Sequence, residues 1–155
     1  MRRVESKIVI NAEINKVWSA ITSIQNYPNW NPFIIAVDAS QIPPIVDTEM
    51  EFTVYWKNGS IRKTKEVVNS FLPPKESNAK KVGEWSYYFK SFLSTIAMIR
   101  ATRKQIISST EEGVTFYHTY EDFKGWGVYF LPIANIKDGF DRQAKALKKY
   151  CEQRD

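Results

Sequence analysis

The sequence predicts an α+β fold in which one antiparallel sheet packs against a long C-terminal helix. Three observations lead to this prediction. A strand-like segment near the N-terminus is followed by residues of helical periodicity, six further strand-like segments are joined by short turns, and residues 132–152 return to helical spacing. Sequential strands with short connections favour an antiparallel meander, because parallel neighbours need long crossovers.

The length and composition fit one globular domain. At 155 residues the chain corresponds to a single domain, which we expect to span 1–155. Such a chain buries about 68–70% of the surface that its unfolded form exposes, so it needs no disulfide or metal. Aromatic residues make up 14% of the sequence. This excess favours either a large core or an apolar cavity.

Several classes of protein are excluded by what the sequence lacks. The chain has one cysteine, Cys151, and one histidine, His118, which leaves little to hold a metal. It carries no P-loop, dinucleotide-binding, zinc-protease or serine-hydrolase motif, so we expect no cofactor. We interpret Cys151 as a small buried apolar residue. No segment is apolar enough to span a bilayer or act as a signal peptide, and a cytoplasmic location is expected.

In the first third of the chain, the spacing of apolar residues changes from that of a strand to that of a helix and back. Residues 4–10 have the pattern of a strand, and apolar residues then recur at helical spacing from Val17 to Ile24, with Asn15 as the expected N-cap. Two prolines restrict 27–31 to a short second helix or a turn. The sequence therefore predicts two short helices between the first and second strands.

Breaker residues divide the middle of the chain into strands. Asn58-Gly59 and a turn ending at Gly113 indicate hairpins, and Pro73-Pro74 is expected to end a strand. The six predicted strands are 33–39, 49–56, 61–72, 83–93, 96–108 and 113–123.

The last segment has an apolar stripe along one side of the predicted helix. Gly139 within this helix costs about 1 kcal/mol relative to Ala, unless a bound molecule or close packing on the sheet needs the missing side chain. The twisted sheet must cover its apolar face, and this helix is available to do so. A wedge then lies between sheet and helix, either filled by aromatic rings or open.

Three segments of the chain resemble a known superfamily: KIVINAEINKVWSAITSIQNYPNWNPF, GVTFYHTYEDFKG and GFDRQAKALKKYCE. Together they resemble the START-related superfamily called SRPBCC, especially its polyketide cyclase/dehydratase and lipid transport branch. The resemblance implies a helix-grip fold, in which a curved seven-stranded antiparallel sheet wraps around the C-terminal helix and encloses a deep apolar cavity. Members of this superfamily bind lipids, sterols, polyketides or plant hormones, and some are cyclases or co-chaperones.

Alternation along the strands predicts which side chains face that cavity. In the last strand it places Phe116, His118 and Tyr120 inward, opposite Thr119 and Glu121. The full set of candidate ligand-binding residues is Trp30, Phe33, Phe52, Val54, Trp56, Trp85, Tyr87, Phe89, Phe116, His118, Tyr120, Phe130, Ile136, Phe140 and Leu147. Trp30 is equally well explained as a hydrophobic plug under the helix.

His118 is the candidate acid/base, with Tyr87 or Tyr120 polarising a carbonyl. The alternative is a structural histidine hydrogen-bonded to a tyrosine or to a backbone carbonyl. Arg100 and Arg103 point to opposite sides of their strand, and a surface position is expected for both. An inward arginine would be an anchor for a ligand carboxylate.

Three functions remain open. The first is binding, transport or sequestration of a small hydrophobic ligand such as a lipid, isoprenoid or polyketide. The second is a cofactor-independent polyketide cyclase, aromatase or dehydratase. The third is a chaperone-activator-like interaction module that uses the basic stretch 57–104, which has 11 Lys or Arg against 3 Asp or Glu. An open wedge favours the first two, and a filled interior favours the third.

The expected partners follow from the same features. We expect a small hydrophobic molecule and no nucleic acid, because the aromatic residues lie mainly on predicted inner faces where bases cannot stack. Stable membrane insertion is not expected, whereas the basic stretch 57–104 allows transient contact with an anionic membrane. The chain is expected to be a monomer or a weak homodimer.

Overall fold

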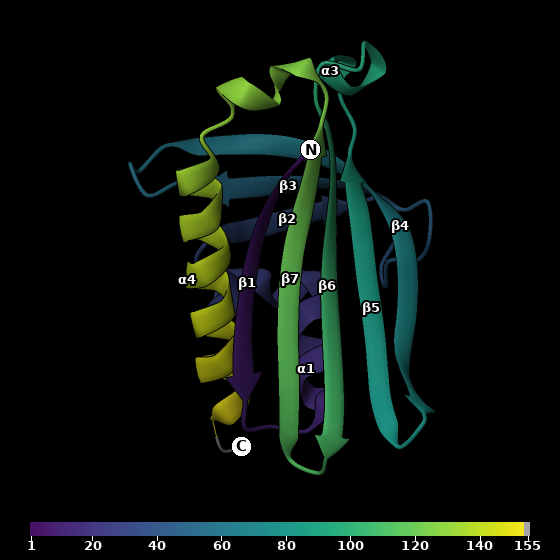
Figure 1. Ribbon diagram of the computed structural model, residues 1–155. Helices are drawn as coiled ribbons and strands as arrows, with labels where there is room; N and C mark the ends of the chain where they lie inside the picture. Colours follow the sequence, from purple (N-terminus) through teal and green to yellow (C-terminus); the bar gives the residue numbers. More distant parts are fainter. Residues whose placement is uncertain (154–155) are drawn as a thin grey trace.

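The computed structural model describes residues 1–153 and has one curved antiparallel sheet that encloses two helices (Figure 1). The elements in chain order are β1 (Arg2–Ile10), α1 (Ile14–Thr22), η1 (Ile24–Asn26), α2 (Tyr27–Trp30), β2 (Ile34–Ala39), β3 (Glu49–Tyr55), β4 (Ile61–Ser77), β5 (Lys80–Phe89), α3 (Phe92–Thr95), β6 (Arg100–Glu111), β7 (Val114–Lys124), η2 (Trp126–Phe130) and α4 (Ile133–Glu152).

The seven strands follow the order β1-β7-β6-β5-β4-β3-β2. Strands that are consecutive in sequence lie side by side, except that β1 pairs with β7 and so joins the two ends of the chain in one sheet. Helix α4 packs along β1 and against α1 inside the curve of the sheet. The expected helix-grip architecture, with two short helices between the first and second strands, is therefore confirmed.

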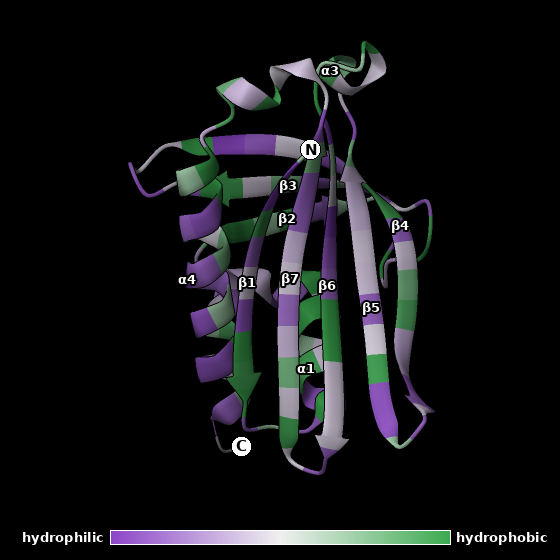
Figure 2. Ribbon diagram, in the orientation of Figure 1, coloured by the Kyte–Doolittle hydropathy of each residue, from purple (hydrophilic) through white to green (hydrophobic). Residues whose placement is uncertain are grey.

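The long helix α4 separates its polar and apolar sides as its sequence predicts (Figure 2). Its buried side includes Ile136, Phe140 and Leu147, and ends at Cys151, which is also buried. Burial raises the pKa of the Cys151 thiol to about 11, so the thiol stays protonated at neutral pH. The interpretation of Cys151 as a small buried residue is confirmed.

The start of α1 differs from the prediction. The N-cap is Glu13, whose backbone is extended and whose side chain makes no capping hydrogen bond, so Asn15 lies one residue inside the helix and the prediction was wrong. Starting at Ile14 adds a buried apolar residue to the stripe formed by Val17 and Ile21. Burial of this side chain explains the earlier start without an Asn cap.

The bounds of three strands also differ from the prediction, and β6 runs from Arg100 to Glu111 instead of over 96–108. Strand β4 continues through Pro73-Pro74 to Ser77, because a register shift between Leu72 and Lys75 removes the prolines from the regular hydrogen-bond ladder. Strand β5 ends earlier, at Phe89, and Ser91 then caps the short helix α3. The segment expected to be one strand over 83–93 is thus a strand followed by a helical turn.

Gly139 lets α4 approach the loop before β2. A Cβ atom at this position would lie 2.3 Å from Cε2 of Phe33, far inside van der Waals contact. Arg142, one turn further along α4, donates hydrogen bonds to the carbonyl oxygens of Pro32 at 2.8 Å and Tyr55 at 3.0 Å. Close packing, one of the two explanations considered for this glycine, therefore accounts for it.

Candidate functional site

A cavity of about 590 Å³ lies between the inner face of the sheet and the first half of α4. Its walls come from β3, β4, β5, β6, β7 and α4, and Phe33 and Ile34 complete one side. The expected wedge is therefore hollow. Its surface is mainly apolar, with a small number of charged and polar side chains.

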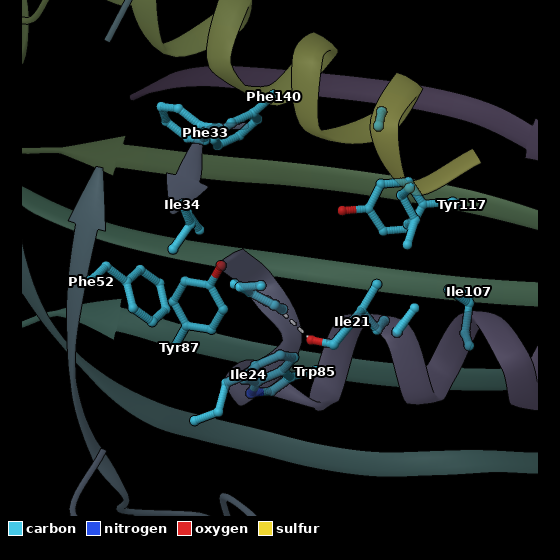
Figure 3. Close-up of a cluster of buried hydrophobic side chains, with 14 of the residues drawn as sticks. Ile21, Ile24, Phe33, Ile34, Phe52, Trp85, Tyr87, Ile107, Tyr117 and Phe140 are labelled. Atoms are coloured by element: carbon cyan, nitrogen blue, oxygen red, sulfur yellow. Dashed lines mark hydrogen bonds between the residues drawn. The ribbon is translucent and has the colours of Figure 1, made fainter. Parts of the chain in front are cut away.

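Eight of the fifteen candidate ligand-binding residues line this cavity. Figure 3 shows Phe52 beside Tyr87, with ring centroids 5.1 Å apart, and Phe33 near Phe140. The candidates that line the cavity are Phe33, Phe52, Val54, Trp56, Tyr87, Phe89, Ile136 and Phe140.

Four other candidates lie elsewhere, because the space around them is already filled or open to solvent. Trp30 packs between Tyr27 and Tyr150, with ring centroids at 5.3 and 5.9 Å, and so acts as a plug under the helix. Trp85 and Leu147 are fully buried in the solid part of the core. Phe130 is 80% exposed on η2, where it contacts solvent instead of the cavity.

The face assignment of β7 was wrong. The buried side chains are Thr115, Tyr117 and Thr119, so Phe116, His118 and Tyr120 point away from the cavity. The inner residues are polar, but each finds a partner on another element. Thr115 Oγ1, for example, donates to the carbonyl oxygen of Ala12 at 2.8 Å, and these bonds remove the cost of burial.

On the outer face, His118 belongs to a surface cluster. Its Nε2 lies 2.8 Å from Oε2 of Glu5 on β1, and its ring packs against Tyr120, over which the guanidinium of Arg3 lies at 4.2 Å. With the sheet between its ring and the cavity, His118 cannot serve as acid/base for a molecule inside, and neither can Tyr120. Tyr87 is the one candidate of the three that reaches the cavity.

The sequence reasoning missed a polar cluster in the cavity wall, formed by Glu66, Arg103 and Glu121. Arg103 is 3% exposed, so the predicted surface position was wrong for this residue, whereas Arg100 is exposed as expected. Arg103 and Glu121 are direct partners on β6 and β7. We call these three residues the polar cluster.

Arg103 is held in place by three contacts. Its Nε donates to Oγ1 of Thr119 at 3.1 Å, and its Nη2 donates to Oε1 of Gln143 at 2.9 Å. Its guanidinium carbon lies 3.9 Å from the ring centroid of Phe140, a favourable cation–π arrangement. The guanidinium has five N–H donors, so donors remain for a guest in the cavity.

Further buried hydrogen bonds hold the partners of Arg103 in place. Gln143 Nε2 donates to Oε1 of Gln105 at 3.4 Å, and the same oxygen accepts from the Tyr117 hydroxyl at 2.7 Å. Gln105 Nε2 in turn donates to the Tyr87 hydroxyl at 3.3 Å. The network therefore connects Arg103 to side chains from three strands and from α4, which restricts its movement.

The two carboxyl groups of the polar cluster hold protons more tightly than ordinary glutamates. Burial raises the pKa of Glu121 to about 7, against the opposing attraction of Arg103. Burial, with a contribution from Glu121, also raises the pKa of Glu66 well above its ordinary value. Among residues 1–153 no salt bridge joins either carboxyl to Arg103. A carboxyl with such a pKa can both accept and release a proton near neutral pH.

The arrangement suits an apolar molecule with an oxygen-bearing head group. Aromatic rings offer a surface for the apolar body, and Arg103 offers donors to a carbonyl, phenol or carboxylate oxygen. Within residues 1–153, no group of three or more His, Cys, Asp and Glu side chains is placed to hold a metal ion. No helix in the same residues is long and apolar enough to cross a bilayer.

The family model described as polyketide cyclase / dehydrase and lipid transport matches residues 1–152. The chain belongs to this family. At the level of the family, membership supports hydrophobic-ligand binding or polyketide cyclisation, and it specifies neither a ligand nor a reaction. No curated protein sequence matches the chain.

Solved structures show the same fold at low sequence identity. The Zhui aromatase/cyclase of a Streptomyces species has a TM-score of 0.70 at 13% identity, covering 97% of this chain and 93% of its own. A START superfamily protein from Mycobacterium smegmatis has a TM-score of 0.68 at 16% identity, covering 97% of each chain. Norcoclaurine synthase from Thalictrum flavum, solved with dopamine and hydroxybenzaldehyde, has a TM-score of 0.69 at 10% identity, covering 99% and 89%. These identities support a shared fold alone.

Proposed function

We propose that the protein binds a small apolar molecule with an oxygen-bearing head group, such as a fatty acid, an isoprenoid acid or alcohol, or a polyketide. The observation that carries the proposal is the polar cluster in the wall of a hollow, mainly apolar cavity. The volume of about 590 Å³ falls in the usual range for small-molecule sites, roughly 300–1,000 Å³.

The charge state of the polar cluster supports a preference for oxygen head groups. Below pH 7 the Glu121 carboxyl is mostly protonated, so the cation of Arg103 is not balanced by it. A ligand carboxylate or sulfonate can then accept hydrogen bonds from Arg103. Above pH 7 the Glu121 carboxylate competes with such a head group, so binding of an anionic ligand weakens.

Anilinonaphthalene sulfonate is a suitable first probe, since it has an aromatic body and an anionic head. We expect its fluorescence to rise on binding and its affinity to be higher at pH 6 than at pH 8. The Arg103→Met variant should lower the affinity roughly tenfold, the scale of one charge-assisted hydrogen bond. Lys104→Gln is the matched control, because Lys104 is the next residue on β6 and pairs with Glu84 at 3.2 Å on the outer face.

Equal affinity for the wild type and Arg103→Met would contradict the head-group assignment. Failure of the wild type to bind the dye, together with no rise in melting temperature from fatty acids, alcohols and aromatic polyketides, would contradict ligand binding in the cavity altogether.

A second candidate function is cofactor-independent acid/base catalysis of cyclisation or dehydration. The specific observation is Glu121, a carboxyl in the cavity whose pKa is raised to about 7 by burial. In this reaction Glu121 takes a proton from the carbon next to a ligand carbonyl, the electron pair moves onto the carbonyl oxygen, and Arg103 stabilises the enolate by hydrogen bonding. Glu121 replaces His118, which lies outside the cavity.

Deuterium exchange into an aryl methyl ketone measures this proton abstraction without the natural substrate. Glu121→Gln should abolish the protein-dependent exchange while dye binding persists, and His118→Ala should leave it unchanged. Wild-type exchange no faster than buffer would remove the support for this candidate and leave the binding function.

The third function considered, an interaction module, depended on a filled interior. The cavity removes that argument, and the basic stretch 57–104 then has no assigned protein partner. The cytoplasmic location and the monomeric or weakly dimeric state stay predictions.

A further inference from the structure

Two neighbouring turns at one end of the molecule expose large apolar side chains. In α3 and just after it, Phe92 is 74% exposed and Ile96 is 47% exposed. In η2, Trp126, Tyr129 and Phe130 are 61%, 81% and 80% exposed. We call these five residues the apical patch. Burying such side chains is favourable, so a contiguous group of them marks an interaction surface.

The two turns lie against each other (Figure 1). The backbone N–H of Gly127 donates to the carbonyl oxygen of Met98 at 2.9 Å, which joins η2 to the segment that follows α3. Gly125 adopts a positive φ of 111°, and a Cβ atom there would lie 2.4 Å from the same oxygen. This close approach makes the apical patch one surface and fixes both turns to the ends of β6 and β7.

The apical patch borders the cavity. Leu93, between the two exposed residues of the first turn, and Ile99, after them, line the cavity wall, and so do Leu131 and Pro132 after the second turn. A molecule that enters or leaves between these residues passes the apical patch. Whatever covers the apical patch therefore lies next to the route of the ligand.

Basic residues flank both segments that carry the apical patch, and two of them, Lys90 and Lys137, pair with the carboxylates of Glu49 and Asp141. Segments 91–99 and 125–136 contain no Asp, Glu, Lys or Arg, and each is flanked on both sides by a basic residue. Two of these, Arg100 and Lys124, are exposed and stand directly opposite each other on β6 and β7. Like charges in directly opposite positions destabilise a sheet. An anionic partner would offset this repulsion.

We propose that the apical patch docks onto the surface of an anionic lipid bilayer, with its rings at head-group depth and with Arg100 and Lys124 facing lipid phosphates. Trp, Tyr and basic side chains are the residues that favour this interface. The exposed side chains stand on two short turns that project from the end of the sheet, a shape suited to insertion. Docking turns the cavity mouth toward the lipid, from which an apolar ligand can pass without crossing water.

Sedimentation of the full chain with vesicles tests this proposal. We expect binding to vesicles of equal parts phosphatidylcholine and phosphatidylserine, weaker binding to phosphatidylcholine alone, and release of the electrostatic part by high salt. Arg100→Gln/Lys124→Gln should lower partitioning onto the anionic vesicles roughly tenfold. Trp126→Ala/Phe130→Ala should lower partitioning onto both kinds of vesicle, because it removes apolar contact area.

Two control variants match these changes away from the apical patch. Lys80→Gln/Lys81→Gln removes two exposed charges at the β4–β5 turn, which lies at the opposite end of the sheet (Figure 1). Tyr88→Ala/Phe116→Ala removes two outer aromatic rings that are 40% and 42% exposed. Both controls should partition like the wild type, and thermal melts confirm that all four variants fold.

Three results would overturn the proposal. The first is a wild type that does not bind anionic vesicles at low salt. The second is a loss of binding in the controls equal to that in the apical variants. The third is self-association of the wild type that Trp126→Ala/Phe130→Ala abolishes and that vesicles do not reverse, which would assign the apical patch to a second copy of the chain. Dye binding is measured without vesicles, so failure of docking and failure of the ligand site are separate outcomes.

Discussion

The two ends of the sheet differ in how their inward side chains pack: one end is filled and the other is hollow. At the end near the β6–β7 turn, Trp85, Ile107, Tyr117 and Leu147 fill the space between sheet and helices with no exposure above 1% of their surface. At the other end, inner residues such as Thr64 are shorter and polar, and they do not fill the space that forms the cavity. Solid packing therefore lies in one half and the cavity in the other, and substitutions in the two halves should have different effects.

The largest expected effect is at the solid end. Trp85→Ala removes a fully buried ring that packs against Phe71 and Tyr87, so we expect the free energy of unfolding to fall by about 3–5 kcal/mol. Urea denaturation measures the loss. Phe130→Ala, an exposed ring at the open end, should change it by no more than about 0.5 kcal/mol. Similar losses in the two variants would contradict the division into a solid and an open end.

The next effect is at the boundary between the two halves. Gly139→Ala places a methyl group against the Phe33 ring, and we expect a net destabilisation of about 1–2 kcal/mol, because overpacking exceeds the gain in helix propensity. Phe33→Ala removes the clash, so adding Gly139→Ala to it should be neutral or stabilising. A cost of Gly139→Ala that is the same with and without the Phe33 ring would contradict the packing explanation.

At the open end, a substitution in the polar cluster should raise the free energy of unfolding instead of lowering it. The pKa of Glu121 is raised from 4.5 to about 7 by burial, so between these values the folded protein keeps a proton that the unfolded chain releases. The free energy of unfolding contributed by Glu121 thus falls as the pH rises through this window. Glu121→Gln should be more stable than the wild type at pH 8 and equal to it at pH 4.

Glu51 on the exposed face gives a control of opposite sign. The hydrogen bond from Lys63, at 2.6 Å, lowers the pKa of the Glu51 carboxyl. Glu51→Gln should therefore lose a little stability at neutral pH and none in acid, once the carboxyl is protonated in both states. Melting temperatures of the wild type and both variants at pH 4 and pH 8 measure these differences. If Glu121→Gln differed from the wild type by the same amount at both pH values, the raised pKa of Glu121 would be contradicted.

The sequence predicted the fold better than the polar part of the cavity. The antiparallel meander and the apolar wall of Phe52, Trp56 and Tyr87 follow from short turns and local alternation, whereas the helix-grip arrangement was implied by the resemblance to the superfamily. Alternation did not predict which face of β7 is buried, because both faces of this strand carry aromatic residues. Apolar content favoured Phe116 and Tyr120, whereas Tyr117 is the buried ring.

The correct face of β7 depends on hydrogen bonds from other elements. Thr119 is stable inside the protein because Arg103 donates to it, and Arg103 is stable there because Phe140 and Gln143 lie on α4. No single strand contains this information. A useful signal was Phe123, which has the same parity as Thr119 and is buried at the end of the strand.

The indole N–H signals of the five tryptophans in a two-dimensional NMR titration with anilinonaphthalene sulfonate test the central claim most directly. Trp56 lines the cavity, Trp126 belongs to the apical patch, and Trp85 lies in the solid core. Binding in the cavity predicts that the Trp56 signal shifts in the wild type, that the shift needs more dye in Arg103→Met, and that the Trp85 signal stays in place. A titration in which only Trp126 responds would contradict a ligand site between sheet and helix.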